Sequence, residues 1–217
     1  MSVTPEWAPP TGTTSGWGVP LVLLLLAAVS VFTVDDSLSR SATEQGWNDE
    51  VHEALRSIEP FGNPYGMAAI LLAIVAMAPD NLMTACRIGT TGVASGLSAG
   101  AVKLLICRAR PHHFDFDHGT ALDSFQGLFP LMSTGGGWQS FPSAHTATAV
   151  AFAVALVRRF PHARWLCYSL AVLVGVQRIE SGQHFASDVF AGAAVGWIIA
   201  RLVLAVWQDC AQTACVP

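Results

Sequence analysis

The sequence predicts an all-α fold, a bundle of about six helices that cross a membrane, and three observations support this. Only 12% of the 217 residues are charged and 52% are hydrophobic, whereas a soluble domain carries about 25% charged residues. The apolar residues gather in six runs that are separated by polar segments. Several of the seven Trp lie near the ends of these runs, where indole rings meet lipid headgroups. The length allows one domain, over residues 1–217.

The six apolar runs are the predicted membrane helices. They cover residues 17–34, 65–78, 83–107, 144–157, 165–176 and 189–207. The second, fourth and fifth runs are shorter than the roughly 20 residues that cross a bilayer, so we expect their ends to reach a polar recess or the interface. Residues 1–16 contain no Lys or Arg, and a cleaved signal peptide needs a basic leader. The first run is therefore predicted to be a retained span.

The polar segments between the runs are predicted to lie outside the membrane. The two long ones are residues 35–63, with a surface helix expected at 48–58, and residues 108–141. Asp35 and Asp36 are expected to form the solvated end of the first run. The net charge is −4 and there is no basic stripe, so we expect no nucleic-acid partner. The motifs described below fall within residues 83–207.

Small residues and cysteines are expected to serve packing. Glycines recur every three or four residues in the third and sixth runs, at Gly89, Gly92, Gly96, Gly100, Gly192 and Gly196. Small residues at this spacing let helix backbones approach closely in lipid, which we interpret as packing without chemistry. The five cysteines show no paired metal-ligand spacing and are expected to be buried thiols: Cys86, Cys107, Cys167, Cys210 and Cys215.

Three polar clusters at the ends of apolar runs are the candidates for chemistry. They contain Lys103, Arg110 and Pro111; then Pro142, Ser143 and His145; then Arg178, His184 and Asp188. The first two clusters are joined by one loop and share a membrane face. The fourth run crosses away and the fifth returns, which brings the third cluster back to that face. An odd number of crossings would have made one shared site impossible, so the topology predicts that the clusters converge.

A converged site would suit a phosphate group. Lys103, Arg110 and Arg178 are three cations with few carboxylates among them, and cations near hydrocarbon usually mark function. Arginine offers two-pronged donation to phosphate oxygens, and lysine acts as a point charge. Ser143 and Ala144 lie where a helix is expected to begin, so the Ser143 hydroxyl and free backbone N–H groups there suit an anion.

The two histidines would supply the reactive groups. His184 and Asp188 are four residues apart and share a face if helical, so the carboxylate can accept from one ring nitrogen and leave the other to attack phosphorus. His145 can donate a proton to the leaving oxygen. Taken alone, His145 could also be a helix-capping or packing residue, and His184 with Asp188 could be a polar pair at a helix end. Their combination with three spaced cations favours a catalytic site.

These clusters resemble the three signatures of the type 2 phosphatidic acid phosphatase family, which includes bacterial lipid phosphatases, glucose-6-phosphatases and soluble vanadium-dependent haloperoxidases. Its pattern is Lys, six residues, Arg-Pro; then Pro-Ser-Gly-His; then Ser-Arg, five residues, His, three residues, Asp. The match runs from Lys103 to about Gly196. It departs at Ala144, where the family has Gly, and at Gln177, where the family has Ser.

The resemblance implies a role for each matched residue. His184 becomes phosphorylated, Asp188 orients it, and His145 protonates the leaving group. Lys103, Arg110, Ser143 and Arg178 hold the phosphate, with no metal and no other cofactor. The implied function is hydrolysis of a phosphomonoester or pyrophosphate on a lipid, such as phosphatidic acid, phosphatidylglycerophosphate, undecaprenyl pyrophosphate or a lipid A phosphate.

Other interpretations remain open at this stage. A lipid or sugar hydroxyl could replace water and make the protein a phosphotransferase, a soluble phosphate ester could be the substrate, or the chain could bind or transport a lipid phosphate without breaking a bond. Residues 112–118, with His112, His113, Asp115, Asp117 and His118, offer metal-ligand types without a recognised spacing. A polar rim around the site is the preferred interpretation of that loop.

Charge also suggests an orientation. Arg158, Arg159 and Arg164 lie in one short loop, which favours the cytoplasm by the positive-inside rule. Arg40, Arg56 and Arg108 fall on the other side and oppose this. Together with the resemblance, the charges predict a bacterial inner (plasma) membrane protein whose site lies on the extracytoplasmic face. The oligomeric state is left open.

Overall fold

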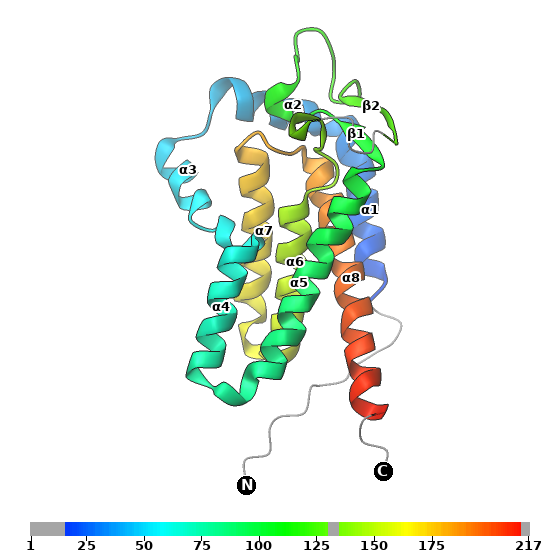
Figure 1. The fold of residues 1–217 in the computed structure, drawn as a ribbon. Coiled ribbons are helices and arrows are strands. Elements are labelled where there is room, and N and C mark those ends of the chain that lie inside the picture. The colour runs from blue at the N-terminus through cyan, green and yellow to red at the C-terminus, as the bar shows by residue number, and fades with distance from the viewer. Residues whose placement is uncertain (1–15, 130–134, 214–217) are drawn as a thin grey trace.

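The computed structural model describes residues 16–129 and 135–213 (Figure 1). Six helices correspond to the six predicted runs: α1 Gly18–Thr33, α4 Pro64–Met77, α5 Leu82–Lys103, α6 Ala144–Arg159, α7 Arg164–Glu180 and α8 Ala186–Thr213. The surface helix expected at 48–58 is present as α3, Asp49–Arg56. A short helix, α2 Asp35–Arg40, continues into the π-helical turn Ser41–Gln45. The prediction of a mostly helical fold is confirmed.

Polar side chains begin several of these helices. The Asn63 side chain accepts from the Gly66 N–H at 3.0 Å at the start of α4, and Asn48 accepts from Glu50 at 2.8 Å at the start of α3. Ser143 caps α6 in the same way, accepting from Thr146. Each cap satisfies an N–H group that has no partner within the helix. The helix start predicted at Ser143 is therefore confirmed.

Helix α6 is the centre of the bundle. It contacts α5, α7 and α8, which surround it in Figure 1. Its residues 146–149 and 151–156 are all buried, and Phe152 packs with Ile88 of α5, Val174 of α7 and Leu204 of α8 in one apolar core. A helix that is apolar all round needs neighbours on every side, so the alanine-rich sequence of α6 places it inside.

The glycines of α8 bring it against the backbone of α6. A Cβ atom at Gly192 would lie 2.4 Å from the Ser143 carbonyl oxygen, and one at Gly196 would lie 2.4 Å from that of Ala147. On α5, Gly92 and Gly96 face the side chains of Met67 and Thr148, whereas nothing lies within 4 Å of Gly100. The packing prediction is thus confirmed most clearly for the two glycines of α8.

The outer surface of the helices is apolar. Leu25 of α1, Leu72 of α4 and Val172 of α7 are each at least 64% exposed. Within the described residues, one helix is long and apolar enough to cross a membrane alone, Ala186–Gln208 of α8, and the segments Gly18–Thr33 and Asp35–Glu44 pass together as a pair bent by 72°. Helices α6 and α7 have 16 and 17 residues, about 24–26 Å at the usual rise. The count of six membrane crossings stays a prediction.

The loop after α5 contains a short sheet that the all-α prediction did not include. Strand β1, Ile106–Arg108, pairs antiparallel with β2, Phe125–Leu128. Cys107 and Arg108 of β1 are buried, whereas all four residues of β2 are exposed, so β1 is the strand that packs against the rest of the protein. Three residues are too few to show a strand periodicity in the sequence, which explains the omission.

Candidate active site

The three motifs lie together at one end of the bundle. The ammonium of Lys103, at the end of α5, donates to the carbonyls of Gln139 and Ser140 at 2.6 and 3.1 Å. The Ser143 N–H donates to the Asp188 carbonyl at 3.0 Å and ties the start of α6 to α8. Arg110 contacts Gln183, next to His184. The predicted convergence is therefore present in the structure.

His184 lies in the turn between α7 and α8 and is 3% exposed. Its Nδ1 atom is 3.5 Å from Asp188 Oδ2 and 3.5 Å from Ser140 Oγ. The Ser140 hydroxyl and the Phe185 N–H donate to the same Asp188 oxygen at 2.6 and 3.0 Å. Because Nδ1 faces the carboxylate, Nε2 is the ring nitrogen that remains for another partner. Burial lowers the pKa of His184 to about 4, which keeps the ring neutral and nucleophilic near pH 7.

Behind Asp188 lies a fully buried ionic network, here called the buried cluster: Asp35, Arg108, Ser187 and Asp188. The Arg108 guanidinium donates to Asp188 at 2.6 Å, to Ser187 Oγ at 2.6 Å and to Asp35 at 2.9 Å. Asp35 also accepts from the Ser187 N–H at 2.9 Å. Arg108, Asp35 and Asp188 are 0% exposed. The network therefore fixes the second oxygen of the carboxylate that faces His184.

The Arg108 side chain is enclosed as well as paired. Its Nε donates to Ser124 Oγ at 3.0 Å, and its guanidinium carbon lies 4.2 Å from the ring centroid of Phe125 and 3.9 Å from that of Phe185. The interpretation of Asp35 as a solvated helix end was wrong. The 72° bend between α1 and α2 brings this carboxylate inward, where Arg108 balances its charge.

A second group, here called the open cluster, consists of Glu59, His145 and Arg178. One Glu59 oxygen is 3.1 Å from Arg178 Nη2, and the other is 3.6 Å from His145 Nε2. The Arg178 side chain is 9% exposed, whereas His145 and Glu59 are 35% and 29% exposed. The expectation of few carboxylates among the cations missed Glu59, which precedes α4 and lies outside all three motifs. A substrate can reach this cluster, unlike the buried one.

Arg110 stands beside the open cluster with incomplete charge compensation. Its Nε donates to the Gly136 carbonyl at 2.9 Å, and its Nη1 donates to the Gln183 side chain, and both acceptors are neutral. Burial and the charge of Arg178 lower the pKa of Arg110. A cavity of 240 Å³ lies against Arg110, His112, His113 and Gln183. An anion beside these cations would relieve their repulsion.

Three further predicted positions have local roles in the structure. Ser143 is 0% exposed and its hydroxyl accepts from Thr146 Oγ1 at 2.9 Å as well as from the Thr146 N–H, so this side chain is engaged as a helix cap. Ala144 is the first residue of α6, in right-handed helical geometry, which alanine adopts without strain. Gln177 accepts from Arg178 Nε at 2.6 Å and thereby orients that guanidinium.

The histidine-rich loop divides into two parts. His112 Nδ1 donates to the Gly182 carbonyl at 2.8 Å, and His112 and His113 line the cavity beside Arg110. His118 pairs with Asp115 at 2.7 Å, and their side chains are 85% and 65% exposed. Among the described residues, no three His, Cys, Asp or Glu side chains come together as metal ligands. The first part of the loop agrees with the predicted polar rim.

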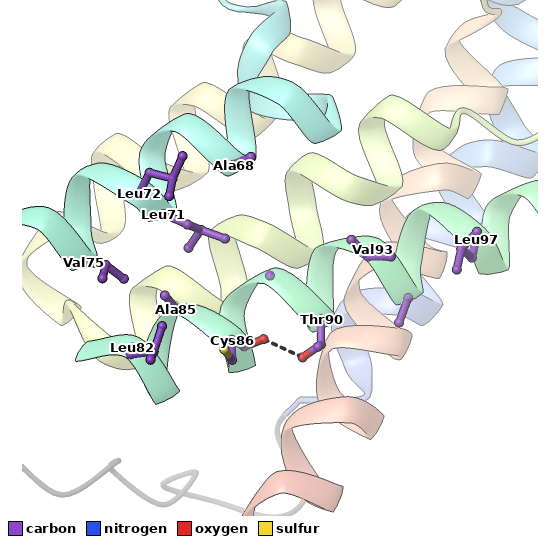
Figure 2. Close-up of a pocket in the computed structure, with 12 residues that line it drawn as sticks. Ala68, Leu71, Leu72, Val75, Leu82, Ala85, Cys86, Thr90, Val93 and Leu97 are labelled. Carbon is purple, nitrogen blue, oxygen red and sulfur yellow. Dashed lines mark hydrogen bonds between the residues drawn. The ribbon is translucent and has the colours of Figure 1, made fainter. Parts of the chain in front are cut away.

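A separate apolar groove of 630 Å³ lies between α4 and α5 (Figure 2). Leu71, Leu72 and Val75 of α4 face Val93 and Leu97 of α5 across it. None of the residues that line it belongs to the three motifs. Cys86 also lines this groove and is exposed, so the prediction of a buried thiol was wrong there; it is confirmed for Cys107 and Cys167, while the side chains of Cys210 and Cys215 fall outside the description.

Comparison with known proteins places these observations in a family. The model of the PAP2 superfamily matches residues 84–212. A "Lipid A 1-phosphatase" of Rhizobium etli is 38% identical over 121 residues, which cover 56% of this chain and 49% of that protein. A "Lipid A 4'-phosphatase" of Porphyromonas gingivalis is 32% identical over 114 residues, 51% of this chain and 45% of that protein. The chain thus spans about half the length of the curated relatives it matches.

Solved structures share the fold. The transmembrane PAP2 type phosphatidylglycerolphosphate phosphatase from Bacillus subtilis has a TM-score of 0.57 and 22% identity, covering 89% of this chain and 96% of that chain. LpxE of Aquifex aeolicus has a TM-score of 0.54 and 20% identity, covering 79% of this chain and 98% of that chain. The arrangement of the helices is therefore one that membrane proteins of this family adopt.

Proposed function

The chain belongs to the PAP2 superfamily, and on this premise we propose that it is an integral-membrane phosphatase that removes phosphate from a lipid through a phosphohistidine, without a metal. The observation that carries the proposal is the setting of His184. Its Nδ1 faces Asp188 at 3.5 Å, while Arg110 contacts the neighbouring Gln183. A neutral imidazole held by a carboxylate beside cations suits attack on a phosphate.

In the first step, the lone pair of His184 Nε2 attacks phosphorus and the bond from phosphorus to the leaving oxygen breaks. His145 donates a proton to that oxygen, so a neutral hydroxyl departs. His145 Nε2 points toward Glu59 at 3.6 Å and is 35% exposed, which leaves it within reach of an entering ester. Asp188 accepts from Nδ1 and stabilises the positive charge that forms on the ring.

In the second step, water attacks the phosphohistidine. His145, now neutral, takes a proton from the water, the phosphorus–nitrogen bond breaks, and its electron pair returns to His184. Inorganic phosphate leaves, and both histidines regain their starting states. Throughout, Lys103, Arg110 and Arg178 are proposed to hold the phosphoryl oxygens, because phosphoryl transfer depends mainly on positioning and charge stabilisation. The backbone at Ser143 and Ala144, in the first turn of α6, is proposed to contribute N–H donors.

The proposed setting is a membrane. Exposed leucines and valines cover the helices, and the apolar groove between α4 and α5 adds to this surface. We propose six crossings by α1, α4, α5, α6, α7 and α8. Arg158 and Arg159 end α6 at the opposite end from Ser143, so the positive-inside rule puts the site on the extracytoplasmic face, in a bacterial inner membrane.

Among the four lipid classes that the sequence allows, a lipid A phosphate has specific support. Two relatives that match half of this chain carry the names Lipid A 1-phosphatase and Lipid A 4'-phosphatase. Each name describes removal of a phosphate from lipid A, which is a glycolipid. We therefore propose a phosphomonoester of a lipid-linked sugar as the substrate class.

The test is phosphate release by the purified protein in detergent micelles, with lipid A, phosphatidic acid, phosphatidylglycerophosphate and undecaprenyl pyrophosphate, in the presence of a chelator. We expect release that is fastest with lipid A and that falls at least about a thousandfold in His184→Asn, as for loss of a nucleophile. His118→Asn, at an exposed histidine of the loop, is the matched control and should keep full activity. Normal turnover in His184→Asn would falsify the nucleophile, and transfer of phosphate to an added alcohol in place of release would indicate a phosphotransferase.

A further inference from the structure

Glu59 lies between two residues that the proposed reaction uses. One of its oxygens pairs with Arg178 at 3.1 Å, and the other is 3.6 Å from His145 Nε2. In the proposed reaction Arg178 holds the phosphoryl oxygens and His145 protonates the leaving oxygen. A carboxylate that touches both therefore stands at the leaving-group side of the bond that breaks.

The position of Glu59 is fixed by its packing. It begins the 3-10 turn Glu59–Gly62, in which Phe61 is buried and packs on Phe152 of α6 with ring centroids 5.1 Å apart. Gly62 lies so close to α6 and α7 that a Cβ atom there would be 2.9 Å from the His145 carbonyl and 2.7 Å from the Val174 side chain. The turn is wedged between these helices, so its carboxylate is held in front of His145.

We propose that Glu59 selects the leaving group, a role that rests on the proposed function. A neutral leaving group with hydroxyls, as a sugar or glycerol provides, can donate to the Glu59 carboxylate. The leaving group of a pyrophosphate is itself a phosphate, and its negative charge would face the carboxylate within a partly desolvated site. Repulsion of a competing substrate is a general means of specificity. Glu59 thus favours monophosphate esters over pyrophosphates.

If Glu59 only competed with the substrate phosphate for Arg178, its removal would change the activities in a different way. Because Glu59 occupies donors that a phosphate needs, its removal could raise activity on every substrate alike. The ratio between two substrates that transfer the same phosphoryl group isolates the leaving group. Farnesyl monophosphate and farnesyl pyrophosphate are such a pair, since one releases a neutral alcohol and the other releases farnesyl phosphate.

The experiment measures kcat/KM for both farnesyl lipids in mixed micelles, for the wild type, Glu59→Gln and Glu59→Asp. We expect Glu59→Gln to raise the pyrophosphate value relative to the monophosphate value by roughly tenfold or more, since a like charge within a few ångströms is removed. Glu59→Asp keeps the charge and should keep a ratio close to that of the wild type. Glu53→Gln removes an exposed carboxylate of α3 and should leave the ratio unchanged.

Each other outcome has a distinct meaning. An equal rise on both lipids would show that Glu59 only competes for Arg178 and would overturn the selection proposal. An equal loss on both lipids, with unchanged thermal unfolding, would show that Glu59 serves His145 or Arg178 whatever the leaving group is, and would also overturn it. If the wild type released no phosphate from either lipid or from lipid A, the proposed function itself would fail. If the wild type acts on lipid A but Glu59→Gln leaves the ratio between the two farnesyl lipids unchanged, only the role of Glu59 is rejected and the proposed function stands.

Discussion

Arg108 and Arg178 both pair with carboxylates near the candidate nucleophile, but the two arrangements differ in the exposure of the carboxylate, which is 0% for Asp35 and 29% for Glu59. Arg108 is 0% exposed, and each of its three nitrogens donates to a fixed side chain. Arg178 contacts Glu59, which is 29% exposed. The Arg108 guanidinium makes four hydrogen bonds to fixed side chains with its five N–H donors and has little left to offer a ligand, whereas an arginine beside an accessible carboxylate can exchange that partner for a phosphate. We therefore expect the buried cluster to position Asp188 and the open cluster to bind the phosphate.

The largest expected effect comes from matched carboxylate-to-amide changes in the two clusters. Asp35→Asn leaves the buried Arg108 undercompensated, and breaking a buried ion pair costs about 3–5 kcal/mol. Glu59→Gln acts on a partly exposed pair, for which about 1 kcal/mol or less is expected. Thermal unfolding in detergent measures both. Equal losses of stability would remove the distinction between the clusters.

Asp35→Asn should also reduce phosphate release, because Asp188 loses part of the network that holds it. Asp35 does not reach the phosphate in the proposed reaction, so the loss should appear in kcat with KM little changed. Arg40→Met is the control for removal of a charge near α2, since Arg40 and Asp36 form a pair that is 35% and 44% exposed. A wild-type kcat in Asp35→Asn would contradict a positioning role for the buried cluster.

The next prediction concerns Gly192, at the contact between α8 and α6 that sets the distance between the buried cluster and the open cluster. Asp188 lies on α8 and His145 on α6, and the helices meet where a Cβ atom at Gly192 would be 2.4 Å from the Ser143 carbonyl oxygen. Gly192→Ala must push the backbones apart, and overpacking costs about 1–3 kcal/mol. Gly100→Ala, with nothing within 4 Å, is the control. We expect lower stability and slower phosphate release in Gly192→Ala only.

An effect of similar size should follow when the pH is lowered, through His184, which lies between Asp188 and the proposed phosphate. Burial lowers the pKa of His184 from 6.5 to about 4, so the unfolded chain takes up this proton at a higher pH than the folded protein does. The corresponding stability is present above pH 6.5 and is lost as the pH falls toward 4. His184→Asn removes this contribution, so its unfolding temperature should decline less steeply over that range. Parallel curves for the two proteins would rule out this pKa.

The sequence predicted the residues of the three motifs better than the charged side chains that surround them in the structure. Spacing identified Lys103, Arg110, His145, Arg178, His184 and Asp188, because a reactive group must stand at a helix end and such ends are visible as breaks in apolar runs. Asp35, Arg108 and Glu59 were missed. Asp35 and Glu59 lie in segments that read as ordinary polar connections, and the bend after α1 and the turn before α4 bring them to the site through tertiary packing. Arg108 lies within the first motif, on strand β1.

A partial signal for the missed residues was present in the chain. Arg108 follows an apolar stretch within the first motif, and a charge there needs a partner of opposite sign. Asp35 ends the first run in the same way. Pairing the two would have required knowing that their ends share a membrane face, which the predicted topology already implied. The short β-hairpin that contains Arg108 could not be predicted from the sequence, since its strands have only three and four residues.

The smallest expected effect tests whether the open cluster exchanges its carboxylate for an anion. A ligand that binds only the folded protein raises the unfolding temperature by mass action, so inorganic phosphate should stabilise the wild type by a few degrees. Glu59→Gln frees Arg178 from its partner and should reach the same shift at a lower phosphate concentration. Arg178→Gln should lose most of the shift, whereas Arg164→Gln, at the opposite end of α7, should keep it. Sodium chloride at equal ionic strength separates site binding from general salt effects. A phosphate response that is the same in all four proteins would place the anion elsewhere and leave Arg178 as a structural partner of Glu59, like Arg108 with Asp35.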